Sequence, residues 1–177
     1  MMKIDNIKNI STKKGDSGTS RNYSNETFTK DDIVFETLGT NDELSSVLGL
    51  VYHTTQNAMI KTIQRTLQDI NALIATNPNA QKERYEALTQ LTEADVKTLE
   101  QEETSILKTH PIEPRFFLPG SETTLGGAHY DYARTVCRRA ERMIVRFINM
   151  SERDDLSMAR QYLNRLSDLL FIWARRG

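Results

Sequence analysis

Apolar residues recur every three or four positions through most of the chain, and this period constrains its fold more than any other feature. The spacing is seen at Leu44, Val47, Leu48 and Val51, and again at Ile60, Ile63, Leu67, Ile70 and Ile74. Side chains at this spacing lie on one face of an α-helix. A start signal at residues 39–42 predicts that the first helix begins at Asp42, and Asn77-Pro78 should end the second.

Three more helices are predicted from the same period and from their boundary signals. Thr92-Glu93-Ala94-Asp95 is typical of a capping box, and the helix after it should end before Pro111. A fourth helix should run to about Met150, and a fifth from about Asp155 to Arg175. Strand signals are sparse. The prediction is an all-α protein, a five-helix up-and-down bundle of ferritin-like topology formed by residues 36–177.

The first 35 residues differ from the rest, because they are polar and show no sustained helical or strand period. We interpret residues 1–35 as a loop-like N-terminal arm. A chain of 177 residues is long enough for one hydrophobic core without disulfides or metal, so the arm and the bundle are expected to form one domain.

The charge balance and the apolar content exclude some classes of partner. Lys and Arg number 23 against 24 Asp and Glu, so no chain-wide basic field for nucleic acid is expected. No run of about 18 apolar residues occurs, which argues against a membrane span, and residues 1–6 have no apolar h-region, which argues against secretion. The lone Cys137 should be a core residue. Because a lone cysteine cannot form an internal disulfide, a reducing compartment is expected: the cytoplasm, or the mitochondrial matrix if a presequence has been removed.

Positive charge is concentrated on one side of the fourth predicted helix. At about 100° per residue, Arg134, Arg138 and Glu141 fall within one stripe, with Arg142 beside it. A separate apolar face contains Ala133, Val136, Cys137, Ala140, Ile144 and Phe147. One face can therefore pack while its neighbour binds an anion.

The arm contains a second candidate anion site, the run Thr-Lys-Lys-Gly-Asp-Ser-Gly-Thr-Ser at residues 12–20. Its N–H groups and cations could surround phosphate oxygens, although it lacks the Walker spacing and a solvated turn is the alternative. For the arginines the alternative is surface or intersubunit salt bridges with Asp131, Glu141 or residues 42–43. Together the two cationic segments could neutralise a polyphosphate.

The last predicted helix carries a polar face beside an aromatic residue. That face contains Asn164, Asp168, Phe171 and Arg175, whereas Leu163, Leu166, Leu170 and Trp173 point toward the core. Such a face suits the wall of a ligand site. Ordinary capping and surface pairing is the alternative.

Six runs of residues occur in one order along nearly the whole chain. They are T-x-x-G-D-x-G at 12–18, K-D-D at 30–32, G-T-x-D-E-L at 39–44, F-x-L-P-G at 116–120, R-x-V-C-R-R-A-E-R at 134–142 and L-N-R-L-S-D-x-L-F at 163–171. In these runs the chain resembles the PduO-type ATP:cob(I)alamin adenosyltransferases. The resemblance implies an enzyme, a homotrimer of five-helix bundles that transfers the 5′-deoxyadenosyl group of ATP to reduced cobalamin and releases triphosphate.

The resemblance also implies roles for the matched residues. ATP would be bound at a subunit interface by Thr12, Lys13, Lys14, Gly15, Asp16, Gly18, Ser20, Arg21, Lys30, Arg138, Arg139, Glu141, Arg142 and Asn164. Catalysis would depend on Lys30, Arg138 and Phe116. The cations would meet the departing triphosphate, and Mg²⁺ bound with ATP would share that task; no protein side chain is firmly assigned as its ligand.

Two further sets of roles follow from the resemblance. Phe116 and Phe171 would contact cobalamin, with Phe116 on the lower face of the corrin ring, where it displaces the axial base and makes cobalt easier to reduce. Asp42 and Arg134 would link neighbouring subunits. A cobalamin reductase and an adenosylcobalamin-dependent enzyme are the further partners implied, and neither nucleic acid nor a membrane is.

The chain departs from the family pattern at several positions. Asp131 stands where His is common, Ser121 stands where Gly is frequent, and residues 20–29 and 102–104 also differ. An aspartate at 131 could weaken corrinoid contacts or alter the charge near the arginines. Two alternatives therefore remain: a non-catalytic ATP- or corrinoid-binding module for delivery or sensing, and a plain helical interaction protein.

Overall fold

The computed structural model describes residues 5–11 and 13–176. Within them, five long helices form the bundle: α1 (Ile33–Thr55), α2 (Met59–Ala75), α4 (Glu93–Thr109), α5 (Leu125–Ser151) and α6 (Ser157–Arg176). A short helix, α3 (Lys82–Glu86), follows α2, and 3₁₀ turns cover Ile7–Asn9 and Asp154–Leu156. The predicted five-helix up-and-down bundle is confirmed. None of the described helices has the length and apolar character that crossing a bilayer needs.

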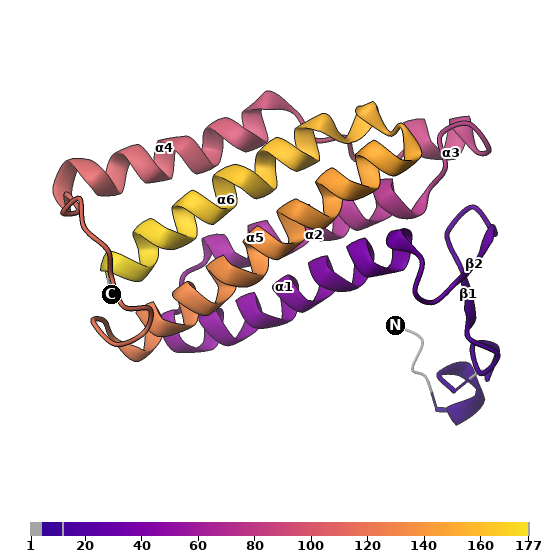
Figure 1. Ribbon diagram of the computed structural model, residues 1–177, viewed down its shortest axis with the longest axis horizontal. Helices are drawn as coiled ribbons and strands as arrows, with labels where there is room; N and C mark the ends of the chain where they lie inside the picture. Colours follow the sequence, from indigo (N-terminus) through magenta and orange to yellow (C-terminus); the bar gives the residue numbers. More distant parts are fainter. Residues whose placement is uncertain (1–4, 12, 177) are drawn as a thin grey trace.

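The long helices lie side by side, and each runs antiparallel to the next long helix in the chain (Figure 1). In the bundle, α1 packs between α2 and α5, and α6 packs between α5 and α4. The loop of residues 110–124 and the end of α6 lie at one end of the bundle, and the arm lies at the other (Figure 1). A helix as long as α5 spans about 40 Å, so the two ends are well separated.

The core is formed by the apolar positions that the helical period predicts. Residues with no exposed surface include Leu44, Leu48, Ile60, Ile63, Ala133, Cys137, Ala140, Ile144, Leu163 and Leu166. The thiol of Cys137 donates to the carbonyl of Leu163 at 3.3 Å, and burial raises the pKa of that thiol. The prediction of a core cysteine is therefore confirmed.

The start of α1 differs from the prediction. The helix begins at Ile33, where the Asp32 carboxylate accepts a hydrogen bond from the backbone N–H of Val34 at 2.9 Å. The hydroxyls of Thr37 and Thr40 donate to carbonyls one turn earlier, both at 2.7 Å. The predicted start at Asp42 is thus wrong, because the polar residues before it satisfy their hydroxyl groups inside the helix.

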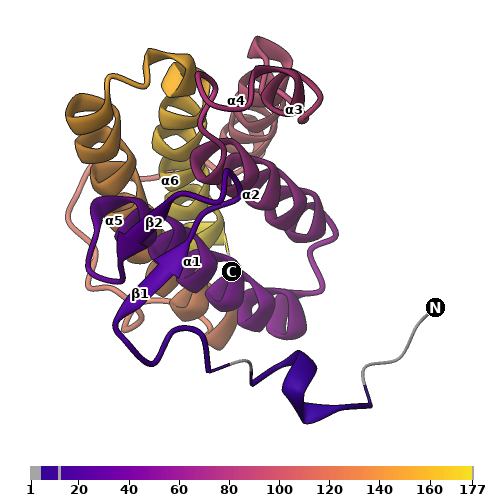
Figure 2. The same cartoon turned by 90° about the vertical axis from the view of Figure 1, so that its right-hand side faces the viewer.

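The arm contains a hairpin that the sequence pattern did not predict. Strands β1 (Thr19–Arg21) and β2 (Thr27–Thr29) pair antiparallel, with Ser20 opposite Phe28. The hairpin tip is held on the bundle, since the N–H of Tyr23 donates to the carbonyl of Ala75 at 2.9 Å and Asn77 donates to Glu26 at 2.8 Å. Figure 2 shows the hairpin across this end of the bundle, beside the start of α1.

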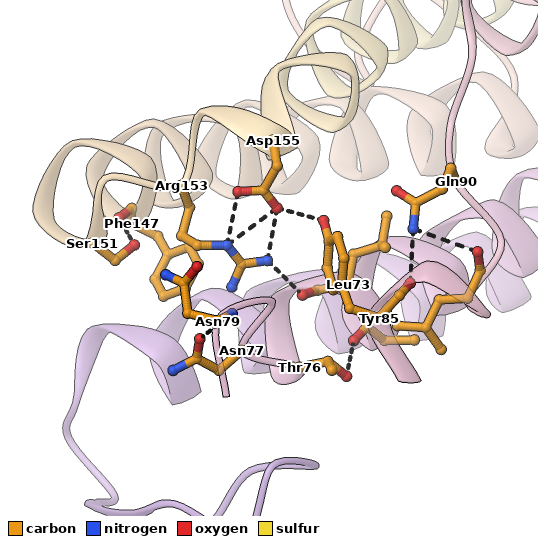
Figure 3. A network of polar contacts seen from close by, with 12 residues as sticks. Leu73, Thr76, Asn77, Asn79, Tyr85, Gln90, Phe147, Ser151, Arg153 and Asp155 are labelled. Carbon is orange, nitrogen blue, oxygen red and sulfur yellow. Dashed lines mark hydrogen bonds and ion pairs between the residues drawn. The ribbon is translucent and has the colours of Figure 1, made fainter. Parts of the chain in front are cut away.

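A buried arginine joins the α5–α6 corner to the end of α2 (Figure 3). Arg153 is 8% exposed; its Nη2 lies 2.9 Å from an Asp155 carboxylate oxygen and donates to the carbonyl of Leu73 at 2.9 Å. The hydroxyl of Tyr85 donates to the same carboxylate. Burial, and then this hydrogen bond, raise the pKa of Tyr85 to about 12. Burial alone would raise the pKa of Asp155, but the hydrogen bonds from Arg153 and Tyr85 outweigh it and lower that pKa.

Candidate functional site

The phosphate-binding loop predicted in the arm lies against Lys30. The loop turns at Gly18, whose φ is +79°, and the carbonyl of Gly18 accepts from the N–H of Lys30 at 2.9 Å. The Lys30 ammonium covers Gly15 so closely that an added Cβ there would lie 2.9 Å from Nζ. The structure therefore brings Gly15, Gly18 and Lys30 together. Thr12 lies outside the described residues.

The cations of the arm are exposed and have no counter-ion within the described chain. They are Lys13, Lys14, Arg21 and Lys30. Ser20 and Arg21 belong to β1, while Asp16 lies in the loop, where its N–H donates to the carbonyl of Lys13 at 3.3 Å. This concentration of free positive charge on one short segment suits a polyanionic ligand.

The arginines of α5 divide into two groups. Arg139 pairs with Glu43 of α1, and Arg134 pairs with Asp131, Nε to Oδ1, at 3.3 Å. Both therefore form salt bridges within the chain, while the roles predicted for them at the ATP site and the subunit interface stay predictions. Arg138 and Arg142 are exposed, and no residue of the described ranges forms an ion pair with either.

Two other predicted ATP-binding residues meet between α5 and α6. The amide of Asn164 donates to the Glu141 carboxylate at 2.8 Å. Both side chains are half-buried. They form a polar floor beside the stripe that carries Arg138 and Arg142.

Within one copy of the chain, the arm does not reach the stripe of α5 that carries Arg138 and Arg142. Phe28 and Asp32 line the same hollow as Phe147, Met150 and Arg153, which places the root of the arm at the C-terminal end of α5. Arg138 lies roughly 20 Å further back along the helix axis. Among the described residues, no hydrogen bond or ion pair joins Arg138 or Arg142 to the arm.

The two residues predicted to contact cobalamin do come together, at the opposite end of the bundle from the arm. Phe116, which is fully exposed in the loop of residues 110–124, and Phe171 of α6 line one pocket of about 520 Å³. The rest of its lining is Leu107, Ile112, Glu113, Pro114, Arg115 and Ile172. An exposed aromatic ring in a mainly apolar pocket favours a large flat ligand.

Sequence reasoning missed Phe117, which anchors the same loop. Its ring lies 6.1 Å from that of Phe171 in an edge-to-face arrangement. The guanidinium groups of Arg115 and Arg175 lie 4.1 and 4.9 Å from its centroid. The two adjacent phenylalanines are visible in the sequence, but only the structure shows that Phe117 packs against Phe171 whereas Phe116 is exposed.

Asp131 is a buried clamp rather than a residue of the pocket wall. Its side chain is 3% exposed and forms an ion pair with Arg175 of α6. It also accepts from the backbone N–H of Gly120 at 3.2 Å and from Arg134. The aspartate thus joins α5, α6 and the loop that carries Phe116, a role that its spacing from Arg134 alone did not indicate.

The residues predicted at the subunit interface both have partners within the chain. Asp42 accepts from the amide of Asn71 at 2.9 Å, and Arg134 pairs with Asp131. Their pairing between subunits stays a prediction. No cluster of three or more His, Cys, Asp or Glu that could hold a metal occurs in the described part of the chain.

Comparison with known proteins links this geometry to one family. The profile of a family described as cobalamin adenosyltransferase matches residues 10–176. The human corrinoid adenosyltransferase MMAB is 37% identical over 180 residues, covering 98% of this chain and 70% of the human protein. The corrinoid adenosyltransferase of Citrobacter freundii is 34% identical, covering 94% of this chain and 93% of its own.

Solved structures agree with the sequence relatives. A variant of the PduO-type ATP:corrinoid adenosyltransferase from Lactobacillus reuteri, complexed with cobalamin and ATP, superposes with a TM-score of 0.83 at 29% identity, over 94% of this chain and 89% of that one. Another variant from the same organism, complexed with ATP, gives a TM-score of 0.79 at 27% identity, over 93% and 91%.

Proposed function

The chain belongs to the cobalamin adenosyltransferase family, and from this we propose that it transfers the 5′-deoxyadenosyl group of ATP to the cobalt of reduced cob(I)alamin. The products would be adenosylcobalamin and triphosphate. The observation that carries the proposal is that one chain has two surfaces, each suited to one of the two substrates. One is a set of exposed cations without counter-ions, and the other is an aromatic pocket with Phe116 and Phe171.

The chemistry needs positioning and charge rather than a protein base. The cobalt electron pair forms the Co–C bond at C5′, the C5′–O bond breaks, and its electrons leave with triphosphate. Cobalt is oxidised from Co(I) to Co(III), and no proton is transferred. Preplaced cations such as Lys30 and Arg138 would stabilise the charge that develops on the leaving group.

We infer that a homotrimer assembles the ATP site. Because the arm root and Arg138 lie roughly 20 Å apart along α5, the arm of one copy would meet the α5 stripe of the next. Asp42 and Arg134 would then pair across that interface. Light scattering on the purified protein should give three times the mass of the chain; a monomer that retains activity would contradict this arrangement.

The described residues offer no cluster of carboxylates, His or Cys for a metal. Mg²⁺ bound with ATP would be held mainly by the phosphate oxygens, the usual mode for this ion. The location in the cytoplasm or mitochondrial matrix and the two protein partners stay predictions.

The pocket around Phe116 would receive the corrin ring. An exposed aromatic side chain on the lower face would exclude water and an axial ligand from cobalt. Phe116→Ala should accordingly slow the reduction of Co(II) more than it weakens ATP binding. The alternative of a non-catalytic module was motivated by Asp131, which pairs with Arg134 and Arg175 and does not line the pocket around Phe116.

The function can be tested by incubating the protein with ATP and chemically reduced cobalamin without oxygen. Adenosylcobalamin and an equal amount of triphosphate are expected. Arg138→Ala should lower kcat/KM for ATP at least tenfold, because it removes a cation that would stabilise the charge developing on the departing triphosphate. Arg65→Ala, a matched exposed arginine on α2 without an ion pair in the described chain, should change it less than twofold. Folded protein that binds both substrates yet forms no product would refute the proposal.

A further inference from the structure

Arg175 is a buried cation with unused hydrogen-bond donors. Its side chain is 5% exposed, and Nη2 pairs with Asp131. Nε and Nη1 are buried and meet no acceptor among the described residues. Leaving a buried donor unsatisfied is unfavourable, and more so when the donor is charged. A ligand that supplied an acceptor oxygen would recover that free energy.

The surrounding charge also favours an anion. The single carboxylate of Asp131 faces two guanidinium groups, those of Arg175 and Arg134. These three side chains together carry one net positive charge, and the carboxylate of Glu122 is a further charge close to Arg175. The Arg175 guanidinium lies 4.9 Å from the ring centroid of Phe117 and 5.4 Å from that of Phe171, so apolar rings separate it from bulk water. Charge attraction is stronger in such a poorly solvated place.

This arginine lines a second pocket, of about 530 Å³, that adjoins the pocket around Phe116. Four residues line both pockets: Ile112, Glu113, Arg115 and Ile172. The acidic side chains of the second pocket, Glu113 and Glu122, are already paired with Arg115 at 3.2 and 2.7 Å. The exposed Arg176 at its edge has no ion pair within the described chain. Arg115, Arg134, Arg175 and Arg176 stand against Glu113, Glu122 and Asp131, so the pocket and the cluster behind it keep one net positive charge.

We propose that this second pocket binds the phosphodiester of the nucleotide tail of cobalamin, with the guanidinium group of Arg175, which lines the pocket, as its main cationic partner. The inference rests on the proposed function, because the tail reaches this pocket only if the corrin ring occupies the neighbouring one. A phosphodiester supplies both a negative charge and acceptor oxygens, whereas the amide groups at the ring edge are neutral. Arg176 would add a second cation at the pocket edge.

The test compares cobalamin with cobinamide, a corrinoid that lacks the nucleotide and its phosphate. Arg175→Lys keeps a cation beside Asp131 but removes the planar set of donors. We expect its Kd for cob(II)alamin, measured by calorimetry, to rise about tenfold, whereas its Kd for cob(II)inamide should change less than twofold. Arg165→Lys is the matched control, because Arg165 lies on the same helix and pairs with Glu100 at 2.9 Å. It should leave both constants unchanged.

Two results would overturn the assignment. An equal loss for both corrinoids would mean that the donors serve the ring itself, and no loss for either would mean that Arg175 is purely structural. If Arg175→Lys does not fold, the double variant Asp131→Asn/Arg175→Gln removes both buried charges and should give the same selective loss for cob(II)alamin. Wild-type protein that binds both corrinoids but adenosylates neither would refute the proposed function while the ratio of binding constants still tests this pocket.

Discussion

The ammonium group of Lys30 lies against Gly15, where an added Cβ would be 2.9 Å from Nζ and 3.0 Å from Cε. The contact closes the loop of residues 13–18 against the end of β2. The backbone at Gly15 is not left-handed, so a larger residue there would mainly push the flexible end of the Lys30 side chain away from the loop. The loop and its cation thus form one unit, and a change in either should alter the other.

Gly15→Ala should raise the KM for ATP about tenfold, equivalent to about 1.4 kcal/mol, because the methyl group displaces the Lys30 ammonium from the loop. Steady-state kinetics at saturating corrinoid would measure it. Gly39→Ala is the control: its added Cβ meets nothing within 4 Å, and alanine favours a helix. Equal KM values for the two variants would show that the contact does not serve ATP.

Asp131→Asn should lower the free energy of unfolding by about 3 kcal/mol, because it leaves the Arg175 guanidinium buried without a counter-ion. Urea unfolding followed by circular dichroism would measure the change. Glu113→Gln removes an exposed carboxylate that pairs with Arg115, and its effect should stay within about 0.5 kcal/mol. A loss below 1 kcal/mol for Asp131→Asn would contradict a clamping role.

Glu103 should make stability depend on pH. Burial, followed by the nearby Asp168 carboxylate, raises the pKa of Glu103 to about 7. The folded protein therefore holds a proton that the unfolded chain releases near pH 4.5, so this contribution is full at low pH and is lost as the pH rises toward 7. Because the group is only partly buried, we expect a contribution on the order of 2 kcal/mol.

Glu103→Gln should abolish that part of the pH dependence, since the amide mimics the protonated acid at every pH. Urea midpoints at pH 5 and pH 8 would show it. Glu93→Gln, which changes an exposed carboxylate on the same helix, should keep the wild-type slope. If Glu103→Gln and wild type lose stability in parallel from pH 5 to 8, the raised pKa of Glu103 is wrong.

Arg153→Met should destabilise the protein by about 3 kcal/mol, because the Asp155 carboxylate loses its counter-ion and the carbonyl of Leu73 loses its hydrogen-bond donor. Tyr85→Phe removes only one hydrogen bond of the same network and should cost about 1 kcal/mol. Unfolding of both variants and of the exposed control Arg160→Met would establish the order. A loss for Tyr85→Phe greater than that for Arg153→Met would show that the tyrosine, not the arginine, holds this corner.

The bundle could be predicted because its apolar positions, such as Leu44, Ile63 and Ile144, are set by a period that the sequence displays directly. The start of α1 could not, because Thr40 and Asn41 have the composition of a cap but lie inside a helix. The hairpin was missed for a different reason. Strands of three residues are too short for an alternating pattern to be recognised.

The candidate site was predicted in its parts but not in its connections. The cationic stripe followed from the spacing of Arg138 and Arg142, and the motifs indicated Phe116 and Phe171. No local pattern shows that Asp131 reaches Arg175, because that contact depends on how α5 packs against α6. Long-range pairs of this kind are set by tertiary structure, as is the approach of Lys30 to Gly15.

The enclosure of Cys137 has a practical consequence. The chain has no other cysteine, and this one is fully buried with a raised thiol pKa, so alkylating reagents should leave it unmodified. A fluorophore could therefore be attached to Ser17→Cys, in the exposed loop of the arm, without first removing the native residue. The fluorescence of such a labelled protein would show directly whether added nucleotide changes the surroundings of that loop.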